Sequence, residues 1–225
     1  MKDISIWMEE LKEKLLAHFG GRLRYLGLQG SFGRGEATPK SDIDVMTAVE
    51  NLSIADLDAY RDIVATMEES GRACGFICGL EELQNWPRYE LFQVMADTRD
   101  VYGELKAILP AFSDEDVRDF VRINAANLYH ELTHRYLYED RERNIKALPF
   151  CYKGSFYILM NLHYLRTGEV LSTKKALLGQ LSGDDQVVLE TAMGGTPVTE
   201  ENFDEKFALL LRWCRRLLRE MREEG

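Results

Sequence analysis

The sequence predicts an α+β protein in which a mixed β-sheet with packed helices comes first and an all-α, up-and-down helical bundle follows. In the first half, short apolar stretches bounded by glycine alternate with amphipathic helical patterns, which is typical of a sheet covered by helices. After Leu109 and Pro110 the pattern changes, and apolar residues recur every three or four positions over long stretches. We therefore expect one domain over residues 1–110 and a second, helical domain over residues 111–225.

The first elements of the chain follow from local patterns. A helix is expected over residues 2–20, where apolar side chains recur at helical spacing until a Gly-Gly pair ends it. A short apolar strand bounded by glycines is expected over residues 22–29. Residues 32–35 are expected to form one or two helical turns, and a second strand is expected over residues 42–49.

The remainder of the first domain continues the alternation. Ser53 is a favourable N-cap for a helix over residues 53–71, which a glycine ends. The apolar segment 73–79 predicts a buried strand. Residues 89–96 and 101–102 are expected to form a further pair of strands, joined by a polar turn.

The second half is expected to contain three long and two short helices, from Ser113 onward and over residues 144–167, 174–181, 184–193 and 200–223. Pro149 in the second of them predicts an irregular start or a kink. Basic residues between 212 and 222 alternate with leucines and acids, which we interpret as a solvated helix face.

Composition limits the class of protein. The chain has 225 residues, of which 45% are hydrophobic, enough to bury a core. A formal charge of −10 and a pI near 5.0 argue against a nucleic-acid partner, because a surface that binds nucleic acid must neutralise several phosphates with Lys and Arg. The same negative charge suits a cationic acceptor. The four cysteines lack the spacing of a zinc site or a disulfide framework, so we expect buried thiols. Neither a membrane span nor an export signal is visible, which predicts a cytoplasmic protein.

One segment, Gly30–Asp44, carries the chemistry. Its glycine-rich turn can present backbone N–H groups to an anion. If residues 42–45 form a strand, Asp42 and Asp44 project from the same face of it. Paired carboxylates suit Mg²⁺, which usually completes its shell with substrate phosphates, so the segment predicts a nucleotide site. The alternative is an ordinary glycine-rich loop with Asp42 as a helix cap.

The pattern formed by residues 30–31, 34–35 and 41–44 resembles the signature of the DNA polymerase β-type nucleotidyltransferase superfamily, and more closely its small bacterial members such as the aminoglycoside nucleotidyltransferases. The resemblance implies a Mg²⁺-dependent enzyme that transfers a nucleoside monophosphate, AMP from ATP, to a hydroxyl of a small-molecule acceptor and releases pyrophosphate. The resemblance also implies that Asp42 and Asp44 hold the metal ion.

The resemblance also implies roles for the residues of the turn. Gly30 and Ser31 would contact the phosphates of the nucleoside triphosphate. Arg34 would add positive charge there or, alternatively, pair with Glu36 or Asp44 and hold the loop.

A third carboxylate on a neighbouring strand normally completes such a site as metal ligand or base. The expected strand, residues 73–78, contains no acid. Glu90 is the best substitute, ahead of Glu81, Glu82 and Asp97. If none of them serves, the acceptor brings its own base or the protein binds nucleotide without transferring it.

The second half resembles, more weakly, the helical domain that follows the catalytic domain in aminoglycoside nucleotidyltransferases, a bundle related to the HEPN type. The similarity rests on residues 152–154, 164–168 and 172–176. In those relatives a lysine after a Thr-Gly turn reaches the triphosphate, which here points to Lys174, with Lys175 as the alternative.

Two further functions remain open beside small-molecule adenylylation. One is transfer of a nucleotide to a protein or an RNA end, and the other is nucleotide binding without catalysis. A homodimer is compatible with the apolar bundle. Trp86 is most simply a core or interface residue, although Trp86 and Tyr89 are candidates to stack on an acceptor ring.

Overall fold

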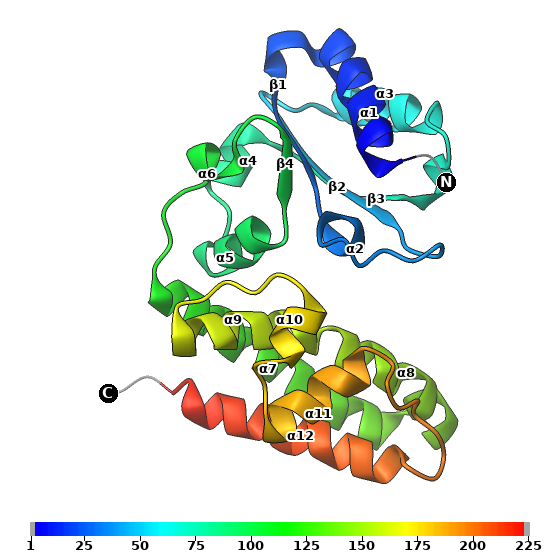
Figure 1. Cartoon of the computed structure of the whole chain (residues 1–225), viewed down its shortest axis with the longest axis vertical. Coiled ribbons are helices and arrows are strands. Elements are labelled where there is room, and N and C mark those ends of the chain that lie inside the picture. Colours follow the sequence, from blue (N-terminus) through cyan, green and yellow to red (C-terminus); the bar gives the residue numbers. More distant parts are fainter. Residues whose placement is uncertain (1–2, 223–225) are drawn as a thin grey trace. The chain divides into compact units, whose positions relative to one another are not determined.

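The computed structural model describes residues 3–222. The chain divides into two compact units, Met1–Ala111 and Phe112–Gly225 (Figure 1). As the sequence predicts, the first unit contains a mixed sheet with packed helices and the second is helical. Among the described residues, no helix is long and apolar enough to cross a membrane.

A four-stranded sheet organises the N-terminal unit, with the strand order β3-β2-β1-β4. The strands are β1 (Leu23–Leu28), β2 (Ile43–Val49), β3 (Ala73–Gly79) and β4 (Arg99–Tyr102). The inner strand β1 runs antiparallel to both of its neighbours, β2 and β4, whereas β2 and β3 run parallel to each other. The start of β2 therefore lies beside the end of β1 and the start of β3.

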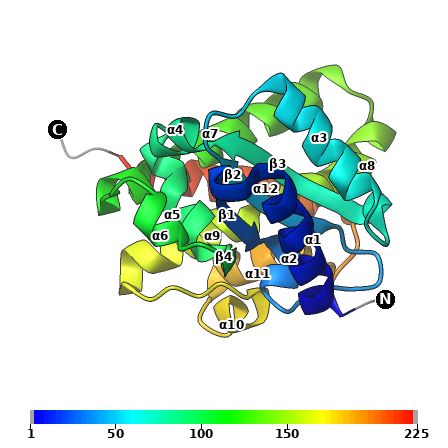
Figure 2. The same cartoon turned by 90° about the horizontal axis from the view of Figure 1, so that it is seen from above.

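Helices cover both faces of this sheet. They are α1 (Ile4–Phe19), α2 (Gly30–Gly33), α3 (Ile54–Ala65), α4 (Leu80–Gln84), α5 (Arg88–Ala96) and α6 (Leu105–Ile108). The first and third pack side by side on one face (Figures 1 and 2). Ile43 and Val45 of β2 belong to that core, while Met46 and Ala48 pack on the opposite face against residues of α4 and α6.

The predicted strand over residues 89–96 is wrong, because this segment is the helix α5. The prediction relied on its aromatic and apolar content, yet Val94 is its one β-branched residue, and Leu, Met, Ala, Gln and Glu all favour helix. Leu91 and Phe92 are buried on one side, as in an amphipathic helix. Residues 101–102 do lie in a strand, β4, which pairs with β1.

Six helices form the described part of the C-terminal unit: α7 (Asp114–Tyr138), α8 (Arg141–Lys153), α9 (Ser155–Thr167), α10 (Lys174–Leu178), α11 (Gly183–Ala192) and α12 (Phe203–Glu220). The long helix α7 packs against α9 and α12. The helix expected over residues 144–167 is in fact two helices that meet at Gly154, and Pro149 lies inside the first of them. Glycine is a poor helix former, so the division falls there and not at the proline.

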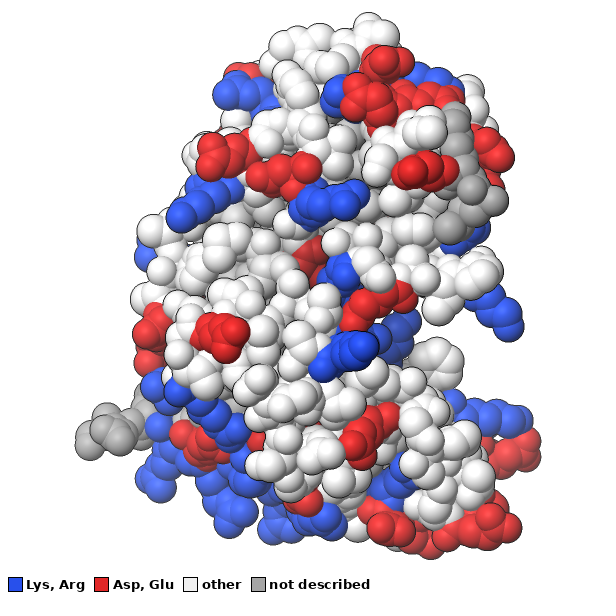
Figure 3. Space-filling view, in the orientation of Figure 1, with Lys and Arg blue, Asp and Glu red and all other residues white. Residues whose placement is uncertain are grey.

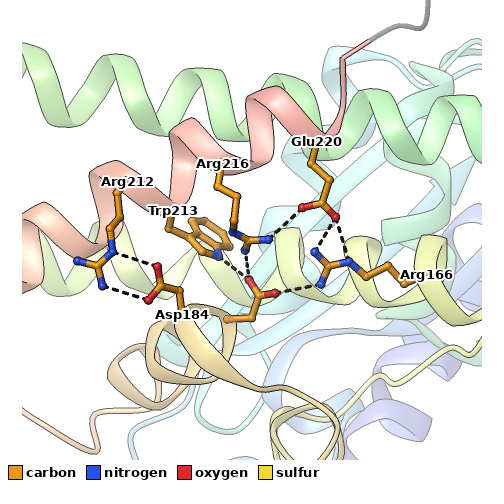
Figure 4. A network of polar contacts seen from close by, with 7 residues as sticks. Arg166, Asp184, Arg212, Trp213, Arg216 and Glu220 are labelled. Atoms are coloured by element: carbon orange, nitrogen blue, oxygen red, sulfur yellow. Dashed lines mark hydrogen bonds and ion pairs between the residues drawn. The ribbon is translucent and has the colours of Figure 1, made fainter.

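A buried carboxylate ties three of these helices together. Asp185 of α11 accepts hydrogen bonds from the indole of Trp213 (2.7 Å) and from the guanidinium groups of Arg166 (3.0 Å) and Arg216 (Figure 4). Glu220 bridges the same two arginines. Because every donor here is charged or fully buried, the network fixes how α9, α11 and α12 pack.

Acids also engage the basic residues near the end of the chain. Lys and Arg side chains gather where α12 ends, with acids among them (Figure 3). Arg212 makes two 3.0 Å hydrogen bonds to Asp184, and these hold the pKa of that carboxyl below its usual value. Pairing of this kind supports the interpretation of residues 212–222 as a solvated helix face.

Candidate active site

The first position of the turn after β1 favours glycine, both by its backbone conformation and by its close approach to a neighbouring side chain. Gly30 has a φ of +63°, and a Cβ there would lie 2.0 Å from Oδ2 of Asp44. The backbone N–H of Gln29 donates to the carbonyl of Asp44 at 2.8 Å, which holds the turn against the start of β2. The glycine backbone therefore lies directly beside the carboxylate, an approach that a residue with a side chain would obstruct.

The two predicted carboxylates, Asp42 and Asp44, lie at or just before the start of β2. Ile43 and Val45 are both 2% exposed and point into the core under α1 and α3. By strand alternation, Asp44 points to the opposite face of the sheet, and Asp42 precedes the strand by one residue. Asp42 is exposed, whereas Asp44 is half-buried against Gly30.

Arg34 holds the turn in place. Its side chain is 7% exposed, and its guanidinium pairs with Glu36 (3.1 Å) and with Asp97. The Glu36 contact is one of the two loop-holding partners expected from the sequence. Asp97 also accepts a 3.4 Å hydrogen bond from the backbone N–H of Gly30.

Sequence reasoning ranked Asp97 low, because nothing local marks it as part of the site. It follows α5, 67 residues beyond Gly30 in the chain. Its neighbour Thr98 accepts a 2.8 Å hydrogen bond from the side chain of Gln29, so the two segments are joined at several points. The contacts of Gly30 and Gln29 with residues 97–98 depend on how α5 packs in the folded chain. They therefore correspond to no local sequence motif that could be recognised in advance.

The strand β3 contains no acid, as the sequence indicates, and carries a thiol at its second residue. The parallel register places Cys74 opposite Asp44, and Cys74 is exposed, contrary to the expectation of buried thiols. The other three cysteines are buried. Among the described residues, no group of three or more His, Cys, Asp or Glu side chains is placed to hold a metal ion.

Glu90 lies on the same side of the sheet as Asp44. Phe76 of β3 is opposite Met46 and packs with it, and the ring of Trp86 stacks on Phe76 with centroids 5.7 Å apart. The indole N–H of Trp86 donates to Glu90 at 2.8 Å. One face of this indole is therefore already covered, which leaves less of it for an acceptor ring.

Tyr89 lies beside Glu90. Burial and the negative charge of the adjacent carboxylate raise the pKa of the Tyr89 phenol, so it stays neutral at physiological pH. A neutral phenol can donate a hydrogen bond but supplies no base.

Lys174 lies in the C-terminal unit, at the start of α10. Thr173 caps this helix, and the ammonium group of Lys174 lies 5.7 Å from the centroid of the Phe156 ring. A cation–π contact of this kind holds the lysine near α9. Lys175, the alternative, is exposed.

Comparison with known proteins gives two matches. Residues 8–92 match the family model of the nucleotidyltransferase domain, and this range contains the Gly30 turn and both predicted metal ligands. The chain also resembles the crystal structure of spectinomycin adenyltransferase AAD(9) from Enterococcus faecialis with ATP and spectinomycin, with a TM-score of 0.57 and 14% sequence identity. That similarity covers 95% of this chain and 98% of the other, so the two share a fold over both units. Among curated proteins, none matches.

Proposed function

Because residues 8–92 form a nucleotidyltransferase domain of the DNA polymerase β type, we propose that the chain transfers AMP from ATP to a hydroxyl of a small-molecule acceptor and releases pyrophosphate. One observation carries this proposal. The backbone of the Gly30 turn lies directly against the carboxylate of Asp44, so closely that a Cβ at position 30 would displace that carboxylate. A triphosphate in the turn would thus reach the carboxylates that bind its metal.

The residues present fit a Mg²⁺ ion. Asp42 and Asp44 offer the hard oxygen ligands that Mg²⁺ prefers, and such an ion usually completes its shell with waters and substrate phosphates. When bound, Mg²⁺ would neutralise phosphate charge and lower the pKa of the acceptor hydroxyl.

The chain's own groups then position the reactants. Ser31 would donate its hydroxyl and its amide to the terminal phosphates. The acceptor oxygen forms a bond to the α-phosphorus, the bond from that phosphorus to the bridging oxygen breaks, and pyrophosphate leaves with the electron pair. Glu90 would accept the hydroxyl proton.

We propose an aminoglycoside-like antibiotic as the acceptor. The similar structure contains spectinomycin together with ATP, and the net charge of −10 favours a cationic ligand.

A second candidate, nucleotide binding without transfer, is favoured by one observation. β3 contains no acid, and its register places Cys74 opposite Asp44, so the site lacks a carboxylate on β3. In this case ATP would bind in the same turn, but no pyrophosphate would form with any acceptor.

Pyrophosphate release with ATP, Mg²⁺ and a panel containing spectinomycin and aminoglycosides tests the proposal. We expect Asp42→Asn and Asp44→Asn each to remove several kcal/mol of transition-state stabilisation, which is roughly 10²-fold or more in rate. The melting temperature without metal should stay within a few degrees of wild type.

Asp62→Asn is the matched control, since Asp62 is an exposed aspartate of the same unit on α3. Its rate should equal that of wild type. ATP binding by calorimetry without pyrophosphate release from any acceptor would support the second candidate, and no ATP binding at all would contradict both.

A further inference from the structure

Arg72 lies at a position that the sequence motif does not include. It is the last residue of a short 3₁₀ turn, Ser70–Arg72, which leads into β3. Its Nε and Nη2 atoms both donate to the carbonyl oxygen of Ser41, at 3.0 and 2.6 Å, and its remaining nitrogen pairs with Glu69. A half-buried guanidinium thus places two of its donors on one backbone carbonyl 31 residues away.

That carbonyl belongs to the peptide unit that carries Asp42. Because the peptide group is planar, fixing the oxygen of Ser41 also fixes the plane that ends at the Cα atom of Asp42. The Asp42 side chain is exposed, and no hydrogen bond or ion pair joins it to another of residues 3–222. Its direction therefore depends on its backbone, and Arg72 holds that backbone.

The same guanidinium contacts the other half of the motif. Its central carbon lies 5.6 Å from the centroid of the Phe32 ring, which follows Ser31 in the turn and is 7% exposed. Such a contact is attractive and directional. Arg72 therefore joins the glycine turn to the peptide before Asp42, which are the two parts that a metal–triphosphate complex must contact together.

We propose that Arg72 is a positioning residue that sets the Asp42 carboxylate to receive a divalent cation beside the Gly30 turn. This inference rests on the proposed function, because it assigns Arg72 to the same site. Lysine cannot replace it, since an ammonium group lacks the planar pair of donors that binds one oxygen and stacks on a ring.

The chain offers a closely matched control. Arg22 is also the last residue of a 3₁₀ turn before a strand, pairs with an acid, Asp56, and lies 5.6 Å from the centroid of a ring, Phe19. It adjoins the opposite end of β2, where Leu23 pairs with Val49. Arg72→Lys and Arg22→Lys therefore remove similar contacts, but only the first adjoins the site.

Two measurements on the full chain test the proposal. Hydrogen exchange without metal or nucleotide should become faster across residues 36–44 in Arg72→Lys and stay unchanged there in Arg22→Lys. Mn²⁺ affinity, measured by electron paramagnetic resonance with a non-hydrolysable ATP analogue, should fall by roughly tenfold or more in Arg72→Lys, the usual effect of losing a group that orients a metal ligand. Arg22→Lys should bind Mn²⁺ as wild type does.

Each outcome has one meaning. Equal Mn²⁺ affinity and equal exchange in Arg72→Lys and wild type would overturn the positioning role and leave the proposed function intact. Failure of wild type to bind Mn²⁺ with the analogue would overturn both. If Arg72→Lys does not fold, Arg72→Met keeps the aliphatic stem but removes every donor to Ser41, and an Mn²⁺ affinity unchanged from wild type in that variant would also overturn the role.

Discussion

Gly30 is under two constraints that can be separated experimentally. Gly30 and Gly35 both have positive φ values, +63° and +72°, which cost an alanine roughly 1–2 kcal/mol. A Cβ at position 35 would meet nothing within 4 Å, whereas a Cβ at position 30 would strike the Asp44 carboxylate. The two glycines therefore differ in crowding and hardly at all in backbone strain.

We expect Gly30→Ala to reduce kcat/KM for ATP by about 10²-fold, because a displacement near 1 Å in a reacting group has that effect. Both variants should lower the melting temperature, because both place an alanine at a positive φ. Gly35→Ala should nevertheless leave kcat/KM close to wild type. Steady-state kinetics and thermal melts of both variants provide the check. Equal loss of activity in the two would mean that strain, and not the contact with Asp44, explains the glycine.

The helix α5 changes how the third carboxylate should be sought. As a helix, it places Glu90 and Asp97 seven residues apart, or about 10 Å along the axis. Glu90 is oriented by the Trp86 indole, and Asp97 by Arg34 and the Gly30 amide. One carboxylate is therefore available for chemistry, while the other is already engaged in holding the turn.

From this division we expect different kinetic effects. Glu90→Gln should lower kcat by roughly 10²-fold or more, the usual contribution of a general base, and should leave KM for ATP close to wild type. Asp97→Asn should chiefly raise KM for ATP. A loss of kcat in Asp97→Asn together with an unchanged kcat in Glu90→Gln would transfer the role of base to Asp97.

Several elements were predictable because their signals are local. The strands β1, β2 and β3 are short apolar segments bounded by glycine or polar residues, and α3 begins at Ser53, which forms a capping box with Asp56. The strand predicted in place of α5 failed because periodicity over eight residues does not separate a buried helix from a strand. The helix-favouring composition of residues 89–96 was the local signal that separates the two.

The candidate site divides in the same way. The Gly30 turn and the aspartate pair could be found from the sequence, because they lie within fifteen consecutive residues. The contacts of Arg34 with Asp97 and of Arg72 with Ser41 could not, since each joins segments that only the folded sheet brings together.

The two units of the chain raise the question of whether the helical one contributes to nucleotide binding. We expect Lys174→Ala to raise KM for ATP by roughly tenfold, as loss of one charged hydrogen bond of 1.5–3 kcal/mol would do. Lys175→Ala is the control, because Lys175 lies on the same helix and is exposed. The test is to measure KM for ATP in both variants at saturating acceptor. A tenfold increase confined to Lys175→Ala would assign nucleotide binding to Lys175 and remove it from Lys174.

The hydrogen bond between Gln29 and Asp44 has a consequence for how this protein can be altered. It closes the base of a hairpin-like excursion, in which Pro39 and Lys40 are exposed. Lengthening a closed loop adds only about 0.6 kcal/mol for each doubling of its length. A fluorophore or a short peptide tag inserted at that tip would thus sit a few residues from the reacting groups while the base of the excursion keeps its shape.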